Sequence, residues 1–244
     1  EGTAAKNLEA LIELVKSPRH FDRCMFCTDD KHPSDLLHAG HIDDICRKAA
    51  EMEILRRYYA ARCSFLQGHA AKEEAEKILL LMKHLHLSDD LRPVIGAARK
   101  RAEETENPAL AIELPNGEIV TGKTTGLLGP SAALILNALK KLGGIDKTVH
   151  LIPPQVIEPI QELKCRYLGN HNPRLHTDEV LVALSVSAAS DPNAARALAM
   201  LPQLKNCEAH STVILSAVDD NTFRRLGVNL TCDPSYQSHK LYHR

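Results

Sequence analysis

The stretch ALAIELPNGEIVTGKTTGLLG, residues 109–129, decides how the middle of the chain folds. Two runs with apolar residues, 109–114 and 118–123, lie on either side of Asn116 and Gly117. An Asn-Gly pair between two such runs is the strongest short-range signal for a β-hairpin, because both residues tolerate the backbone angles of a tight turn. The stretch therefore predicts two antiparallel strands joined by a turn.

The same stretch contains the letters of a nucleotide-binding P-loop, G-x-x-x-x-G-K-[ST], at Gly117, Gly122, Lys123 and Thr124. A P-loop also needs a flexible glycine loop and a helix that begins at its lysine. Here Ile119 and Val120 are β-branched and favour a strand, and the next helix begins near Pro130. We therefore expect Lys123→Ala to leave the affinity for ATP and GTP unchanged. The helix start at Ser131 stays open as an anion site.

Helical periodicity and capping residues surround the hairpin on both sides. The expected helices are 3–17, a short helix that ends near Gly40, 42–63, 72–87, 92–104, 130–144, 153–169, 177–190, 191–206 and 219–227. The further expected strands are 23–27, 148–152, 210–215 and 228–232. This mixture predicts a helix-rich α/β or α+β fold with a small mixed sheet.

The composition is that of an ordinary soluble protein of 244 residues, with 44% hydrophobic and 25% charged residues. The net charge is −1, aromatic residues make up 4% and tryptophan is absent, so we expect no nucleic-acid and no membrane partner. Seven cysteines, an odd number without a disulfide framework, favour a reducing compartment. No signal peptide or bilayer-spanning run is evident, and a cytoplasmic location is expected.

Residues 1–49 resemble adenine deaminase of the amidohydrolase superfamily through the stretches EGTAAKNLEALIELV and CMFCTDDKHPSDLLHAGHIDDICRKA. The resemblance implies an appended fragment of an α/β barrel, its last strand and the following loop. It also implies that Asp29 is the acidic residue of a metal centre, which ligates Mn, Fe or Zn or takes a proton from the metal-bound water. The other metal-binding strands of that barrel are not in this sequence. We therefore expect the site to be incomplete and the chain to hold no cofactor.

Residues 51–244 resemble the C-terminal half of the domain of unknown function 1846 family, whose members are larger bacterial proteins. The resemblance rests on stretches such as EILRRYYAARC, AIELPNGEIVTGKTTGLLGPSAALILNALKKLGGI, NPRLHTDEVLVALSVSAA and CEAHSTVILSAVDDNTFRRLGVNLTC. It implies a helical part at 51–105, an α/β part at 106–232 and a frayed tail at 233–244. It also implies a missing N-terminal half, or a second copy of the chain, as a partner.

Two functions follow as hypotheses. The first is a ligand-binding or assembly module that does not act alone and has no complete catalytic site. The second is an incomplete adenine deaminase, a hydrolase that acts on an amidine C–N bond and converts adenine to hypoxanthine.

The candidate site residues outside the deaminase-like segment are His176, Asp178 and His210, in RLHTDEV and CEAHST. His176 and Asp178 stand at a predicted helix start, where an acidic residue also stabilises the helix dipole, so both a proton-transfer pair and a plain cap are open. We expect a small anionic ligand at the helix starts of Ser131 and Thr177, with both histidines nearby. Its binding would tighten as the pH falls through their pKa values.

Three other patterns favour structural roles. Cys24 and Cys27 form C-x-x-C without a second pair, which favours buried strand cysteines over a zinc site. His84 and His86 lie in a helical stretch and would point in different directions, which disfavours a shared metal. The basic and aromatic run RRYYAAR, 56–62, favours an amphipathic helix over a nucleic-acid site.

Overall fold

The computed structural model describes residues 33–237, with side chains from Cys46 onward. Contacts divide the chain into two compact units, residues 1–46 and residues 47–244, and the second unit is the subject below. The helix expected at 3–17, the strand expected at 23–27, the barrel fragment and the metal-centre role of Asp29 lie outside the described residues.

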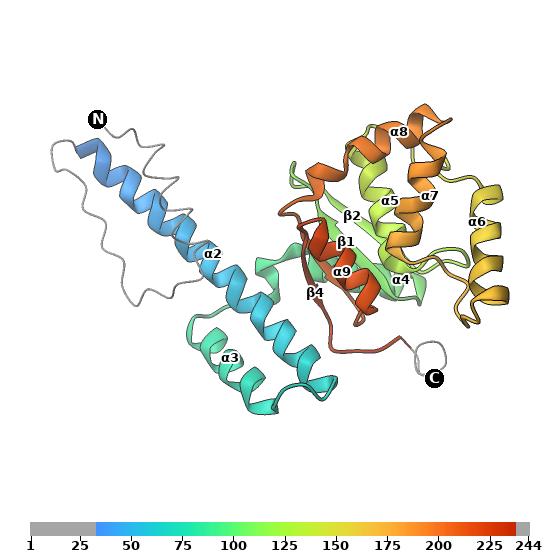
Figure 1. Ribbon diagram of the computed structural model, residues 1–244. Coiled ribbons are helices and arrows are strands. Elements are labelled where there is room, and N and C mark those ends of the chain that lie inside the picture. The colour runs from blue at the N-terminus through green and yellow to red at the C-terminus, as the bar shows by residue number, and fades with distance from the viewer. Residues whose placement is uncertain (1–32, 238–244) are drawn as a thin grey trace. The chain divides into compact units, whose positions relative to one another are not determined.

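The described part of the chain alternates helices with short strands (Figure 1). Its α-helices are α2 (Pro33–Leu66), α3 (Lys72–His84), α4 (Pro93–Thr105), α5 (Pro130–Leu142), α6 (Pro154–Glu162), α7 (Thr177–Ser187), α8 (Pro192–Ala199) and α9 (Ala217–Arg225). Its strands are β1 (Ala109–Glu113), β2 (Ile119–Lys123), β3 (Glu208–Ser211) and β4 (Asn229–Cys232). Short helical turns lie at Asp89–Leu91, Leu163–Tyr167 and Leu201–Leu204. This is a helix-rich α/β fold.

The four described strands form one mixed sheet in the order β2-β1-β3-β4. β1 pairs antiparallel with β2 and with β3, whereas β3 and β4 are parallel. The predicted hairpin is confirmed, since Ala109 lies opposite Lys123 and Glu113 opposite Ile119. Its turn places Gly117 at a φ of 79°, a left-handed angle that glycine adopts at little cost.

The hairpin also explains why the glycine-lysine motif is not a phosphate loop. The Gly117 amide donates to Leu114 O and the Leu114 amide to Glu118 O, so these donors are used within the turn. Gly122 packs against α5 so closely that an added Cβ would lie 2.2 Å from the Leu134 nitrogen. Glycine is therefore needed here for strand–helix packing.

Alternating residues of β1 point to opposite faces of the sheet, as the period of a strand requires. Leu110 and Ile112 belong to the main hydrophobic core, which α5, α7, α8 and α9 complete on one face. Ala111 packs instead with Val94 and Ala98 of α4 on the other face. Figure 1 shows α5, α7 and α8 gathered on the same side of the sheet.

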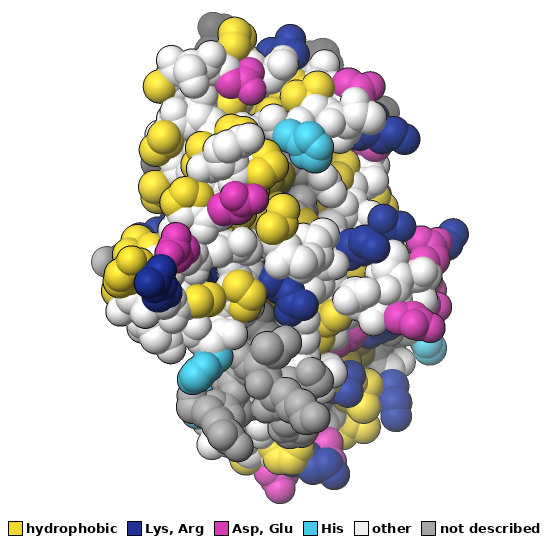
Figure 2. All heavy atoms as spheres, turned by 90° about the vertical axis from the view of Figure 1, so that its right-hand side faces the viewer, with side chains coloured by type: hydrophobic (Ala, Val, Ile, Leu, Met, Phe, Trp, Pro, Cys, Tyr) yellow, Lys and Arg dark blue, Asp and Glu magenta, His cyan; other side chains and the backbone are white. Residues whose placement is uncertain are grey.

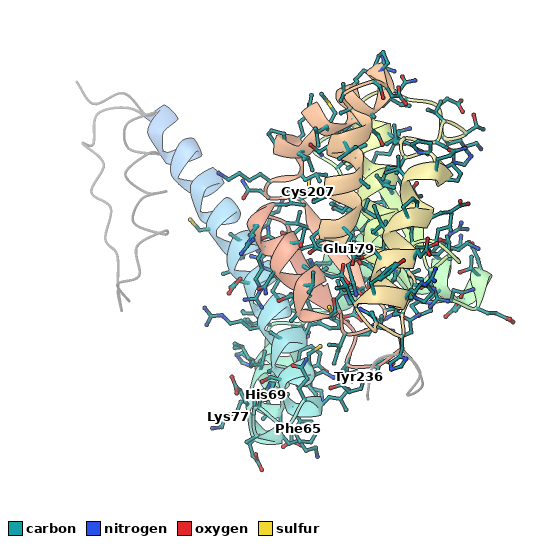
Figure 3. All side chains as sticks on the ribbon, turned by 45° about the vertical axis from the view of Figure 1, so that its right-hand side comes forward. Phe65, His69, Lys77, Glu179, Cys207 and Tyr236 are labelled. Carbon is teal, nitrogen blue, oxygen red and sulfur yellow. The ribbon has the colours of Figure 1, made fainter. Side chains whose placement is uncertain are left out.

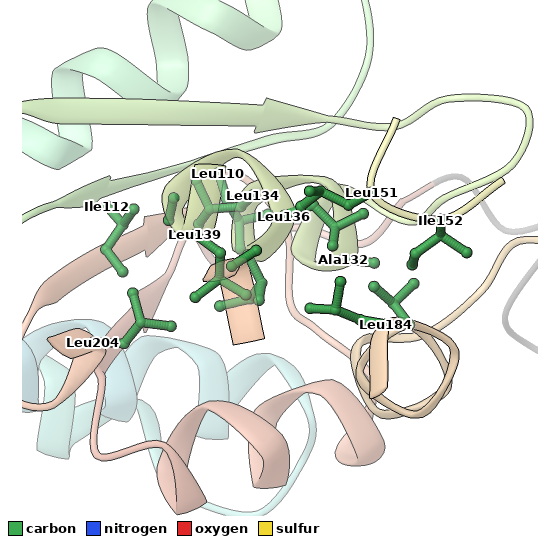
Figure 4. Close-up of a cluster of buried hydrophobic side chains, with 14 of the residues drawn as sticks. Leu110, Ile112, Ala132, Leu134, Leu136, Leu139, Leu151, Ile152, Leu184 and Leu204 are labelled. Carbon is green, nitrogen blue, oxygen red and sulfur yellow. The ribbon is translucent and has the colours of Figure 1, made fainter. Parts of the chain in front are cut away.

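Aliphatic side chains from β1, α5 and α7 converge with others in the main core, as Figure 4 shows. Leu134, Ile135 and Leu139 of α5 are fully buried, and so is Leu184 of α7. On the face shown in Figure 2, exposed hydrophobic side chains alternate with basic and acidic ones, and neither sign of charge dominates.

A smaller core joins α2 and α3 to α4 through Leu55, Tyr59, Met82 and Ile95. Figure 3 labels Phe65, His69 and Lys77 at the end of this helical pair. In the described part of the chain, no helix is both long and apolar enough to cross a bilayer.

Three local predictions are wrong. Gly40 does not end a helix, because α2 runs from Pro33 to Leu66; a single glycine lowers helix stability by only about 1 kcal/mol. Residues 148–152 form an irregular loop instead of a strand, and the loop follows an Asx turn in which the Asp146 carboxylate accepts from the Thr148 amide.

The strand expected at 210–215 spans 208–211 instead. It ends where its parallel neighbour β4 ends, at the pair of Ser211 and Cys232.

Candidate functional site

A pocket of about 430 Å³ lies between the second half of α2 on one side and β4 and α9 on the other. Its charged and polar lining residues are Arg56, Tyr59, Ser64, Gln67, Asp220, Arg224 and Thr231. Its apolar and thiol lining residues are Ala60, Cys63, Ile214, Leu215, Ala217, Leu230 and Cys232. This volume and this mixture of apolar walls with a few polar groups suit a small ligand.

Two arginines line the pocket, and each is paired with carboxylates. Arg56 Nε lies 3.0 Å from Glu53 Oε2 and its Nη1 lies 2.8 Å from Glu208 Oε1, whereas Arg224 Nε lies 2.8 Å from Asp220 Oδ2. A guanidinium carries five N–H donors, so each arginine keeps donors beyond its carboxylate partners. These remaining donors, rather than an excess of positive charge, are what the two arginines offer to an anionic group.

The floor of the pocket includes Tyr59, whose side chain is almost fully buried. Its hydroxyl donates to Asp89 Oδ1 at 2.8 Å and accepts from Arg99 Nη2 at 2.9 Å. Burial, followed by the neighbouring carboxylate of Asp89, raises the pKa of Tyr59 well above its usual range. Tyr59 is therefore a neutral hydrogen-bonding group at physiological pH.

Two thiols line the same pocket. Cys63 Sγ donates to the Cys232 carbonyl oxygen at 3.2 Å. Burial raises the pKa of Cys63 to about 11, and it raises the pKa of Cys232 further. Because the thiolate is the reactive form of cysteine, neither thiol is an activated nucleophile.

Behind the pocket, Arg92 is fully buried at the start of α4 and ties this helix to β3 and β4. It donates to Thr231 Oγ1 at 2.7 Å and to the carbonyl oxygens of Ala209 and Asn229 at 3.0 and 2.9 Å. Arg92 Nη2 also lies 2.8 Å from Glu208 Oε2, an ion pair without a well-aligned hydrogen bond. Burial lowers the pKa of Arg92, and Glu208 opposes this shift.

His210 lies on β3 and faces α4, in the same buried network. Its Nδ1 lies 2.8 Å from Thr231 Oγ1, its Nε2 lies 3.5 Å from Asp233 Oδ1, and its ring meets the Tyr59 ring edge-on at 5.1 Å. Burial lowers the pKa of His210, although Asp233 opposes the shift. Burial therefore favours the neutral form of the ring. The surroundings of His210 do not support the prediction that it gains a proton as the pH falls through neutrality.

His176 lies in a different network, at the junction of α7 and α9. Its Nδ1 lies 3.0 Å from Asp219 Oδ2, and Asp219 Oδ1 accepts from the Thr177 amide at 2.9 Å and from the Thr177 hydroxyl at 2.7 Å. The hydrogen bond to Asp219 raises the pKa of His176, against the effect of burial. Burial alone would raise the pKa of Asp219, but His176 and Thr177 hold it well below its usual range.

Asp219 thus occupies the start of α7, where the sequence predicts an external anion. Asp178, the predicted partner of His176, is exposed and accepts instead from the Glu179 amide at 2.8 Å. Glu179, labelled in Figure 3, accepts from the His176 amide and from Lys164 Nζ, both at 2.7 Å. His176 and His210 therefore belong to separate hydrogen-bond networks, and ligand binding at these residues stays a prediction.

The His176 network does not have the order of a hydrolase triad. Ser216 Oγ donates to Asp219 Oδ2 at 2.8 Å and lies 3.5 Å from the same ring nitrogen, Nδ1, that faces Asp219. A triad needs the nucleophile and the carboxylate on opposite ring nitrogens. Among the described residues, no group of three or more His, Cys, Asp or Glu side chains is placed to hold a metal ion. His84 ends α3, and both His84 and His86 are exposed.

Sequence patterns pointed to only part of the pocket. The run RRYYAAR contains Arg56 and Tyr59, but its pattern favoured a plain amphipathic helix. Asp219 and Asp220 carry a weak signal, since acidic residues in a first helical turn have a structural explanation. Cys232 and Arg92 carry none, because only the tertiary structure brings them to this site.

Comparison with known proteins supports the resemblance of the larger segment. The C-terminal domain of unknown function DUF1846 matches residues 90–242. A UPF0371 protein of Streptococcus pyogenes serotype M3 is 51% identical over 197 residues, which cover 81% of this chain and 40% of that protein. A UPF0371 protein of Streptococcus thermophilus is 49% identical over 202 residues, which cover 83% of this chain and 41% of that protein.

The chain therefore spans about two fifths of the length of these bacterial relatives. The comparisons do not support the resemblance of residues 1–49 to adenine deaminase. The matched segment includes α4 to α9, the whole described sheet and most of the pocket lining outside α2. On this match, the chain belongs to the family of the C-terminal domain of unknown function DUF1846.

Proposed function

We propose that this chain is a ligand-binding module of a longer protein and has no complete catalytic site of its own. The observation that carries the proposal is the pocket between α2 and the β4–α9 side of the sheet, with Arg56 and Arg224 among its lining residues. Its thiols are protonated and its tyrosine is neutral at physiological pH, so these groups support binding better than nucleophilic chemistry.

The proposed ligand is a small molecule with an anionic group and an apolar part. The anionic group would meet the guanidinium groups of Arg56 and Arg224, and the apolar part would pack on Leu215 and Leu230. Ser64 and Gln67 supply further polar groups on the α2 wall. The match covers only 40% of the relative from Streptococcus pyogenes serotype M3. We therefore add a protein partner to the proposal, either an N-terminal part like that of the relatives or another copy of the chain.

The test compares two neighbouring arginines of α9. Both arginines are exposed, but Arg224 lines the pocket and Arg225 does not. Isothermal titration with benzoate, an anion with an apolar ring, should give saturable binding to the parent chain. Arg224→Gln should weaken this binding about tenfold, which corresponds to about 1.4 kcal/mol, and Arg225→Gln should leave it unchanged. Equal losses in both variants would point to a general charge effect and refute the pocket.

The adenine deaminase alternative rests on residues 1–49 alone. It requires a divalent metal at Asp29, which lies outside the described residues. Metal analysis of the purified chain and an assay for ammonia release from adenine separate the two proposals. A bound metal together with ammonia release would favour the enzyme, and neither is expected for a binding module.

A further inference from the structure

The start of α5 carries a buried hydroxyl without a hydrogen-bond partner, next to two backbone amides that lie ahead of the helical ladder. The first hydrogen bond of this helix runs from the Ala133 amide to Gly129 O, so the amides of Ser131 and Ala132 precede the helical ladder. Gly129 at the N-cap has no side chain to accept from them. Ser131 is 1% exposed, and its hydroxyl has no hydrogen-bond partner among the residues that the structure describes.

At the start of the neighbouring helix α7, a carboxylate accepts hydrogen bonds from the corresponding donors. A parallel bridge pairs Leu128 with Leu175, and the Gly129 amide donates to Leu175 O, so the segments leading into α5 and α7 lie side by side. At α7, one oxygen of Asp219 accepts both from the Thr177 amide and from the Thr177 hydroxyl. Ser131 offers the same pair of donors, an amide and a β-hydroxyl, at the start of α5.

From this comparison we propose that the start of α5 binds a small oxyanion, inorganic phosphate or the carboxylate of a small acid, through Ser131 and the amides of Ser131 and Ala132. A buried unpaired hydroxyl is costly, and the partial positive charge of a helix start favours an anion as its partner. The site is separate from the pocket between α2 and the β4–α9 side of the sheet, and it does not depend on the function proposed there.

The surroundings of Gly129 accommodate a side-chain atom without a clash. A Cβ built on Gly129 would lie 3.5 Å from Leu175 O and 3.9 Å from Ser131 Oγ, both ordinary contact distances. The Ser131 hydroxyl therefore lies beside the position that a capping side chain would take. Arg174 Nε donates to Thr125 O at 2.8 Å, which places a cation at the loop that leads into α5. Gly126 in this loop is exposed.

The first experiment follows backbone amides by NMR while sodium phosphate, and in a second series sodium acetate, is added at constant ionic strength. The amides of Ser131 and Ala132 should shift in a saturable manner with at least one of the two anions. Ser131→Ala should weaken this binding at least fivefold. Ser185→Ala, an exposed serine on α7, is the matched control and should leave it unchanged.

In the second experiment, a substituted side chain of the protein accepts hydrogen bonds at the start of α5 in place of an added anion. Gly129→Asp places a carboxylate at the N-cap, so phosphate should no longer raise the thermal midpoint of this variant as it raises that of the parent chain. Gly129→Asn, a neutral cap of similar size, separates the effect of charge from that of shape. Absence of saturable shifts with either anion, or equal affinity of the parent chain and Ser131→Ala, would overturn the proposal and leave a bridging water as the partner of Ser131.

Discussion

Gly122 shows how a single residue fixes the distance between a strand and a helix. A Cβ at this position would lie 2.2 Å from the nitrogen and 2.5 Å from the Cα of Leu134, and both atoms belong to the backbone of α5. Because backbone cannot rotate away as a side chain does, Gly122→Ala should lower the free energy of unfolding by about 3 kcal/mol. Urea unfolding of the two chains measures this difference.

Gly126→Ala is the control for this prediction, since a Cβ there meets nothing within 4 Å. It should change stability by less than about 0.5 kcal/mol, as is usual for an exposed site. An unchanged stability of Gly122→Ala would mean that α5 lies farther from β2 than the structure indicates.

The pair of His176 and Asp219 predicts a pH dependence of stability. The folded-state pKa of His176 is raised, so its stabilisation is fully present below the unfolded-state pKa, about 6.5, and is lost as the pH rises through the folded-state pKa. The pKa of Asp219 is depressed, so its stabilisation is present above about 3.9 and is lost as the pH falls. Besides Asp219, the charged groups near His176 are Glu179 and Lys164.

The measurement compares the free energies of unfolding of the parent chain and His176→Gln at pH 6 and at pH 8.5. The difference between the two chains should be larger at pH 6, because the imidazolium ring is then present and paired with the carboxylate. A difference that does not change with pH would indicate that His176 acts only through packing.

At the scale of elements, Arg92 joins α4 to the two parallel strands. Its guanidinium group donates to carbonyl oxygens of both β3 and β4, and it pairs with Glu208 at 2.8 Å. Arg92→Ala should lower the free energy of unfolding by about 3 kcal/mol, because removal of one partner leaves a mostly buried carboxylate and two carbonyl groups without their donor.

Arg57→Ala is the matched control for Arg92→Ala in denaturant unfolding. Arg57 pairs with Glu53 at 2.9 Å, but the two side chains are 66% and 45% exposed. The loss should stay below about 0.5 kcal/mol, since water screens an exposed pair. Similar losses in both variants would contradict the structural role assigned to Arg92.

Element boundaries followed from the sequence wherever local chemistry decides them. Asn116 and Gly117 fixed the hairpin turn, because turn preferences act over a few residues. Thr177 is the first residue of α7, as its sequence predicts, but the N-cap is His176. Residues 148–152 have an apolar pattern but pair with none of the described strands, and their backbone forms an irregular loop instead. A strand depends on a partner that is distant in sequence, which a local pattern does not contain.

At the scale of the whole molecule, the structure predicts that residues 47–244 fold without the preceding segment. All three described hydrophobic cores draw their side chains from Ile54 onward. A chain that begins at Arg47 should unfold in one cooperative transition, with a urea midpoint close to that of residues 1–244. A broad transition or a lower midpoint would show that residues 1–46 contribute to the stability of this unit.

Local sequence was enough for the fold class, the hairpin, most helices and the rejection of the P-loop, because periodicity, turn residues and β-branching act between neighbours. The candidate sites were a different matter. Asp219 reaches His176 and Thr177 across 43 and 42 positions, and Cys63 meets Cys232 across 169. Such pairs form only when helices and strands pack together. The same packing buries His210, which lowers its pKa, and brings Asp219 to His176, whose pKa the hydrogen bond to this carboxylate raises.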